Sequence, residues 1–261
     1  MFEAHKDLTQ TTADRADTAQ PEAARPGKAG VPARASALHA VPAVPDYLRE
    51  TYTWAYLRPL SLVIFDHPAV VSAILWGHAG RLERALLDEL RPGQRVLQPA
   101  CVYGDLSPRI AAFLGPGGRL DVADVAPVQA ENCRLKLREF PNATVALFDA
   151  AEPRPPVYDA VCSFFLLHEM PDDYRTRVVN ALLGAVRPGG KAVFIDYHKP
   201  HRAHPLKWLT GLVFDLLEPF AKGLWSHEIS DYAQTRDGFT WSTTTYFGGL
   251  FQKTVARRDR R

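Results

Sequence analysis

Acidic side chains stand at the ends of short apolar runs in the middle of this 261-residue chain. Asp124 follows one such run, and Asp149 follows the next. If the runs are parallel strands, their carboxyl ends meet at one edge of a sheet, where ligands bind. An acid at the end of the second strand is placed to accept hydrogen bonds from the two hydroxyls of a ribose, and Asp124 has this position. Asp149 is placed for an adenine amino group, with a turn or helix cap as the alternative, so the pair predicts a nucleoside ligand.

The elements that must position these acids alternate along residues 91 to 199. Short strands are expected at 95–97, 119–123, 143–148, 160–166 and 191–196. Helices are expected between them at 107–114, 127–140 and 171–186. Strands separated by helices imply right-handed crossovers and a mainly parallel sheet, and residues 239–241 and 246–256 are expected to add antiparallel edge strands. The chain is therefore predicted to be an α/β protein with a Rossmann-like core.

The composition changes abruptly at Pro45. Residues 1–44 carry almost no large apolar groups, so they are expected to form a disordered tail without the apolar core of a signal peptide. Residues 45–261 are expected to form a single domain. Its expected parts are a helical N-terminal extension at 45–90, the Rossmann-like core at 91–199, and a lid helix with an edge hairpin at 200–261.

Two longer helices are expected outside the core. Apolar residues recur at helical spacing between Pro68 and Leu90, with Asp66 as the N-cap. Residues 206–225 carry a broad apolar stripe, which suits a helix packed on the core or a lid on a membrane surface, and packing is favoured.

The overall composition limits the classes of partner. The 31 basic and 29 acidic residues nearly balance, so no nucleic-acid partner is expected. No run of eighteen apolar residues is present, so no transmembrane helix is expected. Cys101, Cys133 and Cys162 are far apart and form no CxxC pair, which is typical of buried thiols in a reducing compartment.

The order of these motifs resembles that of class I S-adenosylmethionine (SAM)-dependent methyltransferases. The resemblance rests on Asp149-Ala150, on Tyr158-Asp159-Ala160-Val161 and on Arg187-Pro188-Gly189-Gly190-Lys191, and residues 186–200 look like the quinone-ring methyltransferases. It implies the Rossmann-like class I fold, with Asp124 on the ribose, Asp149 on the adenine and the first loop on the methionine portion. The implied cofactor-binding residues are Gln98, Ala100, Val102, Gly104, Asp124, Val125, Asp149 and Ala150.

The first loop departs from that superfamily. An acid followed by three alternating glycines is usual, whereas the matching positions are Gln98, Ala100, Val102 and Gly104. Val102 is β-branched and does not readily permit positive φ or close backbone approach. Gln98 removes the usual partner of the cofactor's ammonium group. The methionine portion is therefore expected to bind differently, with a degenerate, inactive site as the alternative.

The stretch from Val44 to Arg257 resembles the RquA-type rhodoquinone biosynthesis proteins. The motifs are Tyr52-Thr53-Trp54-Ala55-Tyr56, Phe65-Asp66-His67-Pro68, the loop from Gln98 to Asp105, His168-Glu169, Asp196-Tyr197-His198 and Tyr246-Phe247-Gly248-Gly249. The resemblance implies an enzyme that converts ubiquinone to rhodoquinone by replacing a ring methoxy group with an amino group. It also implies a role in anaerobic respiration. SAM is the implied nitrogen donor, a manganese-type metal assists, and the polyprenyl substrate implies a cytoplasmic protein at the inner face of the cell membrane.

The expected catalytic residues are Tyr103, His168, Asp196 and His198. Alternation along an extended segment would point Asp196 and His198 to the same side, where they are expected to bind the metal. A plainer role for His168 is to shape the pocket. Two other functions stay open: a conventional SAM-dependent quinone methyltransferase, and a non-catalytic protein that binds a quinone or a nucleoside.

Overall fold

The computed structural model describes residues 43–52 and 66–260. All of them belong to one compact unit, which spans residues 39–261. Residues 1–42 of the expected disordered tail lie outside the described residues. Trp54 and Tyr56 of the aromatic motif also lie outside them.

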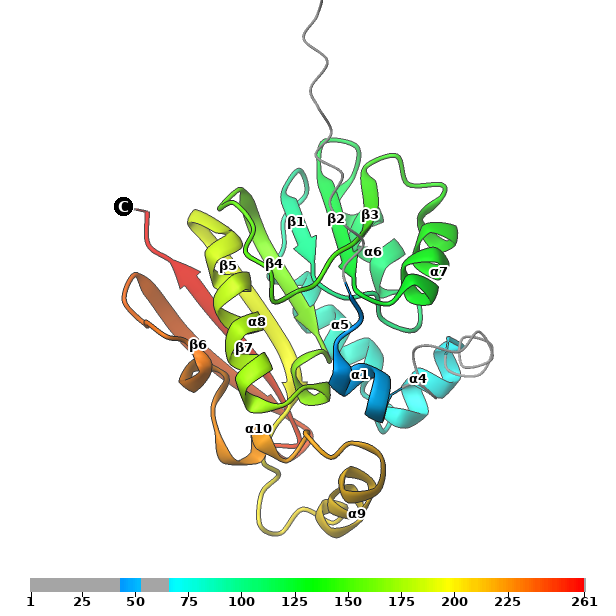
Figure 1. Ribbon diagram of the computed structural model, residues 1–261, viewed down its shortest axis with the longest axis vertical. Helices are drawn as coiled ribbons and strands as arrows, with labels where there is room; N and C mark the ends of the chain where they lie inside the picture. The colour runs from blue at the N-terminus through cyan, green and yellow to red at the C-terminus, as the bar shows by residue number, and fades with distance from the viewer. Residues whose placement is uncertain (1–42, 53–65, 261) are drawn as a thin grey trace, which may run out of the picture. The chain divides into compact units, whose positions relative to one another are not determined.

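The core of the domain is a seven-stranded sheet in the order β3-β2-β1-β4-β5-β7-β6 (Figure 1). The strands are β1 (Arg95–Gln98), β2 (Arg119–Asp124), β3 (Ala143–Leu147), β4 (Tyr158–Phe164), β5 (Val186–Tyr197), β6 (Phe239–Tyr246) and β7 (Phe251–Arg258). Strands β1 to β5 pair in parallel, and β7 runs antiparallel to both β5 and β6. The predicted parallel sheet with antiparallel edge strands is confirmed. Its strand order reverses at β1, because β2 lies on one side of β1 and β4 on the other.

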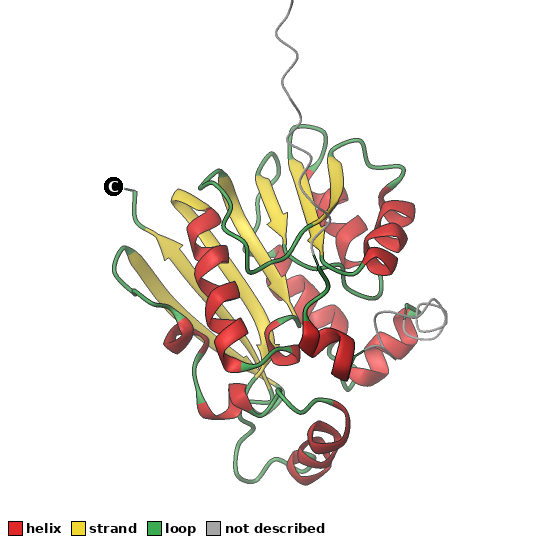
Figure 2. Ribbon diagram, in the orientation of Figure 1, coloured by secondary structure: helices red, strands yellow, loops and turns green. Residues whose placement is uncertain are grey.

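Helices cover both faces of this sheet (Figure 2). They are α1 (Asp46–Thr51), α4 (Pro68–Ile74), α5 (Ala79–Leu87), α6 (Leu106–Leu114), α7 (Pro127–Leu137), α8 (Asp172–Ala185), α9 (Lys207–Leu217) and α10 (Gly223–Ser226), with the short 3-10 turns η1 (Leu167–Glu169) and η2 (Ile229–Tyr232). Successive strand residues point to opposite faces. Val96 and Val193 therefore pack in one core cluster with α5, α6 and α7, while Leu97 and Phe194 pack in another with α8.

The single helix expected from Pro68 to Leu90 is wrong, because the structure has two helices there, α4 and α5. Trp76 and Gly77 between them have φ of 52° and 79°. Such left-handed conformations cannot continue a right-handed helix. The expected N-cap is also wrong: the side chain of His67, rather than Asp66, accepts a hydrogen bond from the backbone N of Ala69 at 3.2 Å.

The helix expected at 206–225 is likewise divided, into α9 and α10. One face of α9 packs on the domain through the buried Phe214. Trp208, Leu212 and Leu216 are exposed on the other face of this helix. No helix among the described residues is long and apolar enough to cross a membrane.

Candidate functional site

An open pocket lies beside the carboxyl ends of β1, β2 and β4, and its empty volume, including the part open to solvent, is about 1290 Å³. This is where the strand order reverses, which is the usual place for ligands of open α/β sheets. Of the expected site residues, those that line the pocket are Ala100, Val102, Tyr103, Asp124, Val125, Asp149, Ala150 and His168.

Asp124 is buried at the end of β2 and fixes the loop after β1. Its Oδ2 accepts a hydrogen bond from the backbone N of Cys101 at 2.8 Å, and its Oδ1 accepts one from the backbone N of Ala126 at 2.8 Å. Burial raises the pKa of this carboxyl to about 6, although these hydrogen bonds lower it. Asp124 is thus held in place where it lines the pocket.

Asp149 follows β3 on the same wall of the pocket. Its Oδ1 accepts a hydrogen bond from the backbone N of Ala151 at 2.8 Å, and its Oδ2 accepts one from the hydroxyl of Tyr174. The ring of Tyr47 packs edge-on against that of Tyr174, with 5.0 Å between the centroids. An acceptor flanked by aromatic rings suits a planar heterocycle that carries an amino group.

The altered loop has a backbone that explains its residues. Gly104 has a φ of 82°, and no other position from Gln98 to Asp105 has positive φ. Ala100 and Val102 occupy conformations open to any residue, and Val102 packs partly against the hydrophobic core. Gly104 is therefore the one position of this loop whose backbone conformation favours glycine.

The side chain of Gln98 is buried behind this loop. Its Nε2 donates to the carbonyl oxygen of Ala100 at 2.8 Å, whereas its Oε1 has no hydrogen-bond partner. A buried acceptor without a partner costs about 1–3 kcal/mol. Gln98 is not among the residues that line the pocket, so this oxygen lies behind the loop that does.

Asp66 holds the other end of the loop, a role that the sequence did not reveal. Its Oδ1 accepts hydrogen bonds from the backbone N of Gly104 at 2.8 Å and from Nζ of Lys136, and its Oδ2 accepts one from Asn132 at 3.1 Å. Nζ of Lys136 also donates to the carbonyl oxygen of Gly104 at 2.8 Å. These contacts tie the N-terminal extension to the loop and to α7. The sequence predicted Asp66 to be a helix N-cap, because an acid shortly before Pro68 at the start of a helix is typical of one. That local signal does not reveal its contacts with the loop.

His168, in η1, is buried between carboxylates at the opposite side of the pocket. Its Nδ1 lies 3.0 Å from Oδ1 of Asp196, and its Nε2 lies 3.9 Å from Oε2 of Glu218. Burial lowers the pKa of the imidazole, but the carboxylates of Asp196, Glu218 and Glu169 outweigh it and raise the pKa to about 9. His168 therefore carries a positive charge at neutral pH.

Glu218 is a candidate functional residue that sequence reasoning missed. It caps the C-terminus of α9, lines the pocket, and accepts a hydrogen bond on Oε2 from the hydroxyl of the buried Tyr52 at 2.8 Å. Burial raises the pKa of its carboxyl, against the opposing effects of His168 and Tyr52. Glu218 lies within the stretch 206–225 that was expected to be helical, and no local signal marks a partner 166 residues away.

The two expected metal ligands do not converge. Asp196 is buried, and its carboxylate accepts a hydrogen bond from the backbone N of Leu167 at 2.8 Å and faces His168. His198 lines a different cavity, where its Nε2 lies 3.5 Å from Oε1 of Glu228. In the described part of the chain, no group of three or more His, Cys, Asp or Glu residues is placed to hold a metal ion. These residues do not fit a shared manganese ion.

Comparisons with known proteins identify relatives in sequence and in fold. No protein-family model matches the chain. The ubiquinone/menaquinone biosynthesis C-methyltransferase UbiE of Ectopseudomonas mendocina is 28% identical over 139 residues, which are 50% of this chain and 54% of that protein. The chain thus spans about half the length of the curated relatives it matches.

Solved structures show the same fold. A SAM-dependent methyltransferase from Aquifex aeolicus matches with a TM-score of 0.51 and 18% identity, over 76% of this chain and 97% of that one. Human N-acetylserotonin methyltransferase, solved in complex with SAM, matches with a TM-score of 0.56 and 17% identity, over 83% and 60%. The fold is the Rossmann-like fold of class I SAM-dependent methyltransferases, as the resemblance implied.

Proposed function

We propose that this protein is a SAM-dependent transferase that acts on the ring of a quinone. The observation that carries the proposal is Asp124, which is fixed at the strand-order reversal and lines the pocket where a ribose would bind. SAM-using proteins of the same fold support the cosubstrate, and relatives named as quinone C-methyltransferases support the substrate class.

The pocket divides into two chemically different parts. The loop after β1, Asp124 and Asp149 make a polar part that suits SAM. Phe165, Tyr197 and other apolar side chains make a second part, and His168 lies against it. A planar quinone ring fits between such side chains, and its carbonyl oxygen would accept a hydrogen bond from the imidazolium.

The charge on His168 supports the rhodoquinone form of this proposal, in which SAM donates nitrogen. The α-amino nitrogen of SAM attacks the ring carbon that bears a methoxy group, a C–N bond forms, the C–O bond breaks, and methanol leaves with a proton from the amine. The adduct is a secondary amine that still carries the SAM skeleton. Its quinone ring takes up two electrons and two protons from the N–Cα unit to give an imine of the hydroquinone, and water hydrolyses that imine to the ring amine and the 2-oxo form of the skeleton. Negative charge develops on the ring oxygen during the attack, and an imidazolium stabilises it. The attack needs a neutral amine, and Gln98 in place of an acid removes a charge that would hold the amine as ammonium.

Conventional methyl transfer is the second candidate, and the named relatives favour it. There a ring carbon of the hydroquinone attacks the methyl group of SAM, and a ring hydroxyl must lose its proton. A charged His168 does not accept that proton at neutral pH, so Glu218 would be the base that faces the pocket.

Product mass separates the two reactions. Purified protein is incubated with SAM labelled at the amino nitrogen and either with ubiquinone or with a hydroquinone that has an unsubstituted ring carbon, in arms with and without manganese. Replacement of methoxy by labelled amino lowers the quinone mass, whereas methylation raises it. Label-free product of raised mass overturns the aminating form, and failure to bind SAM in calorimetry overturns the transferase proposal in favour of a non-catalytic binding protein. Peripheral contact with the membrane that holds a polyprenyl substrate belongs to the same proposal.

A further inference from the structure

Helix α9 presents an apolar stripe to solvent. Trp208 is 72% exposed, Leu212 is 49% exposed and Leu216 is 71% exposed. Residues four apart lie on one face of a helix, so the three side chains form one continuous stripe. Among the large apolar side chains of the described residues, Trp208 and Leu216 are the two most exposed. Isolated exposed apolar residues are ordinary, but a contiguous patch indicates an interaction surface.

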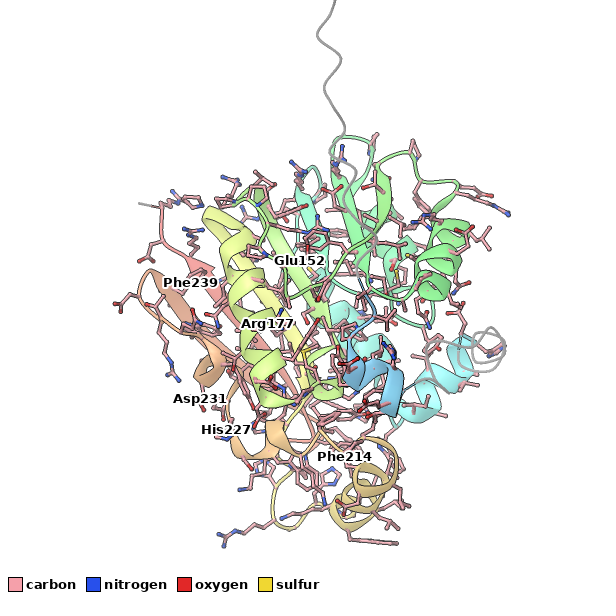
Figure 3. The ribbon with its side chains drawn as sticks, viewed as in Figure 1. Glu152, Arg177, Phe214, His227, Asp231 and Phe239 are labelled. Atoms are coloured by element: carbon pink, nitrogen blue, oxygen red, sulfur yellow. The ribbon has the colours of Figure 1, made fainter. Side chains whose placement is uncertain are left out.

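The opposite face of α9 is firmly attached to the pocket. Phe214 (labelled in Figure 3) is buried. Its ring lies 4.7 Å from the ring of Tyr197, which lines the pocket. At the C-terminus of α9, Glu218 accepts the hydrogen bond from Tyr52. Figure 1 shows α9 at the edge of the domain, away from the strands. The helix therefore links an exposed apolar surface directly to the candidate site.

The charges around the stripe are predominantly positive. The acid on the outer side of α9, Asp215, is paired with Nζ of Lys222 at 2.5 Å, and Glu218 is turned toward the pocket. Lys207 lies in the first turn of α9, and Arg202 lies exposed in the turn before it. These two cations have no ion-pair partner within residues 43–52 and 66–260. The surface complements an anionic partner.

We propose that α9 is a membrane-contacting helix. Trp208, Leu212 and Leu216 enter the boundary between headgroups and acyl chains of an anionic bilayer, while Arg202 and Lys207 contact lipid phosphates. A helix with tryptophan and leucine on one side and basic residues beside them lies in the plane of the interface. With 11 residues, α9 is roughly 16 Å long and so does not span the bilayer.

This inference rests on the proposed function, because a polyprenyl quinone substrate would lie in a bilayer. It deepens that function by identifying where the quinone would enter. A second copy of the chain is a less suitable occupant. A stable interface between copies uses roughly 20–30 residues on each side, whereas this stripe has three.

Vesicle sedimentation with the full chain tests the surface. Vesicles contain about three quarters phosphatidylethanolamine and one quarter phosphatidylglycerol, or phosphatidylcholine alone, and the anionic vesicles are expected to bind better. Trp208→Ser is expected to lower the partition coefficient about tenfold, and Trp208→Ser with Leu216→Ser about a hundredfold. Replacing Arg202 and Lys207 together by glutamine is expected to remove the preference for anionic vesicles.

The matched control is Leu135→Ser, because Leu135 is 58% exposed on α7 and outside the stripe. It is expected to bind vesicles like the wild type. The proposal is overturned if the wild type does not bind, if the double serine variant binds as well as the control, or if the stripe variants change the molecular mass in light scattering instead, which would make a second copy the occupant. SAM calorimetry on each variant checks folding. Vesicle binding without SAM binding would reject the proposed function and leave the surface standing.

Discussion

Replacing Arg175 by lysine tests what keeps His168 and Glu218 opposite each other. Arg175 is on α8 and is completely buried. A guanidinium has five N–H donors, and all of them are used here. The acceptors, at 2.5 to 2.9 Å, are the carbonyl oxygens of Leu167, Met170 and Phe220, the carboxylate of Asp172 and the hydroxyl of Tyr232.

The size of the effect follows from the donors that lysine lacks. Lysine has three donors and no planar fork, so at least two of these acceptors lose their partner. Each buried acceptor without a partner costs about 1–3 kcal/mol, so the free energy of unfolding should fall by about 2–6 kcal/mol. For a domain of this size the melting temperature should fall by roughly 10 °C. Two of the three carbonyl acceptors flank His168 in the sequence, and the third lies just after Glu218.

Calorimetric unfolding measures the stability, and NMR titration of the imidazole measures the pKa of His168. With Glu218 displaced, that pKa should fall from about 9 toward its ordinary value. Arg177→Lys is the control, because Arg177 is exposed on the same helix. If Arg175→Lys is as stable as this control and the pKa of His168 does not change, the reasoning is refuted.

Three further predictions concern charges and the loop. Salt bridges to Glu89 from cations including Lys253 lower the pKa of its carboxyl to about 2 despite its burial, so the stability they provide is present above the unfolded pKa near 4.5 and is lost as pH falls toward 2. Glu89→Gln should therefore lower the free energy of unfolding by about 3 kcal/mol at pH 7 in urea titrations and flatten its dependence below pH 4.5; an unchanged acid limb would contradict this. Asp66→Ala should weaken SAM binding in calorimetry about tenfold, because the backbone N of Gly104 loses its acceptor, and equal affinity would remove the proposed role of Asp66. Because the pKa of His168 is raised to about 9, stability and activity that depend on its charge should be lost as pH rises through that value; Glu218→Gln should shift this loss to lower pH, and an unshifted profile would exclude the coupling.

The sequence predicted residues whose signals are local. Asp124 and Asp149 each follow an apolar run, so their position at a strand end is visible without the fold. Asp66 and Glu218 have the ordinary sequence context of a helix cap and a helix surface, and only folding brings their partners to them. The break at Trp76 was hidden for a related reason, because apolar residues continue at helical spacing on both sides of it.

Two features beside the altered loop support the proposed amination over a degenerate cofactor site. A degenerate loop would be expected to lose its hydrogen bonds, yet Asp124 and Asp66 hold it at both ends. Gln98 places a neutral side chain behind the loop where the superfamily has a carboxylate, which removes a negative charge that would favour an ammonium nearby. His168 places a positive charge beside the apolar part of the pocket, which would favour negative charge on a ring oxygen of the proposed substrate. Both differences act in the same direction, because a neutral amine nucleophile and an electron-accepting ring are what amination of a quinone requires.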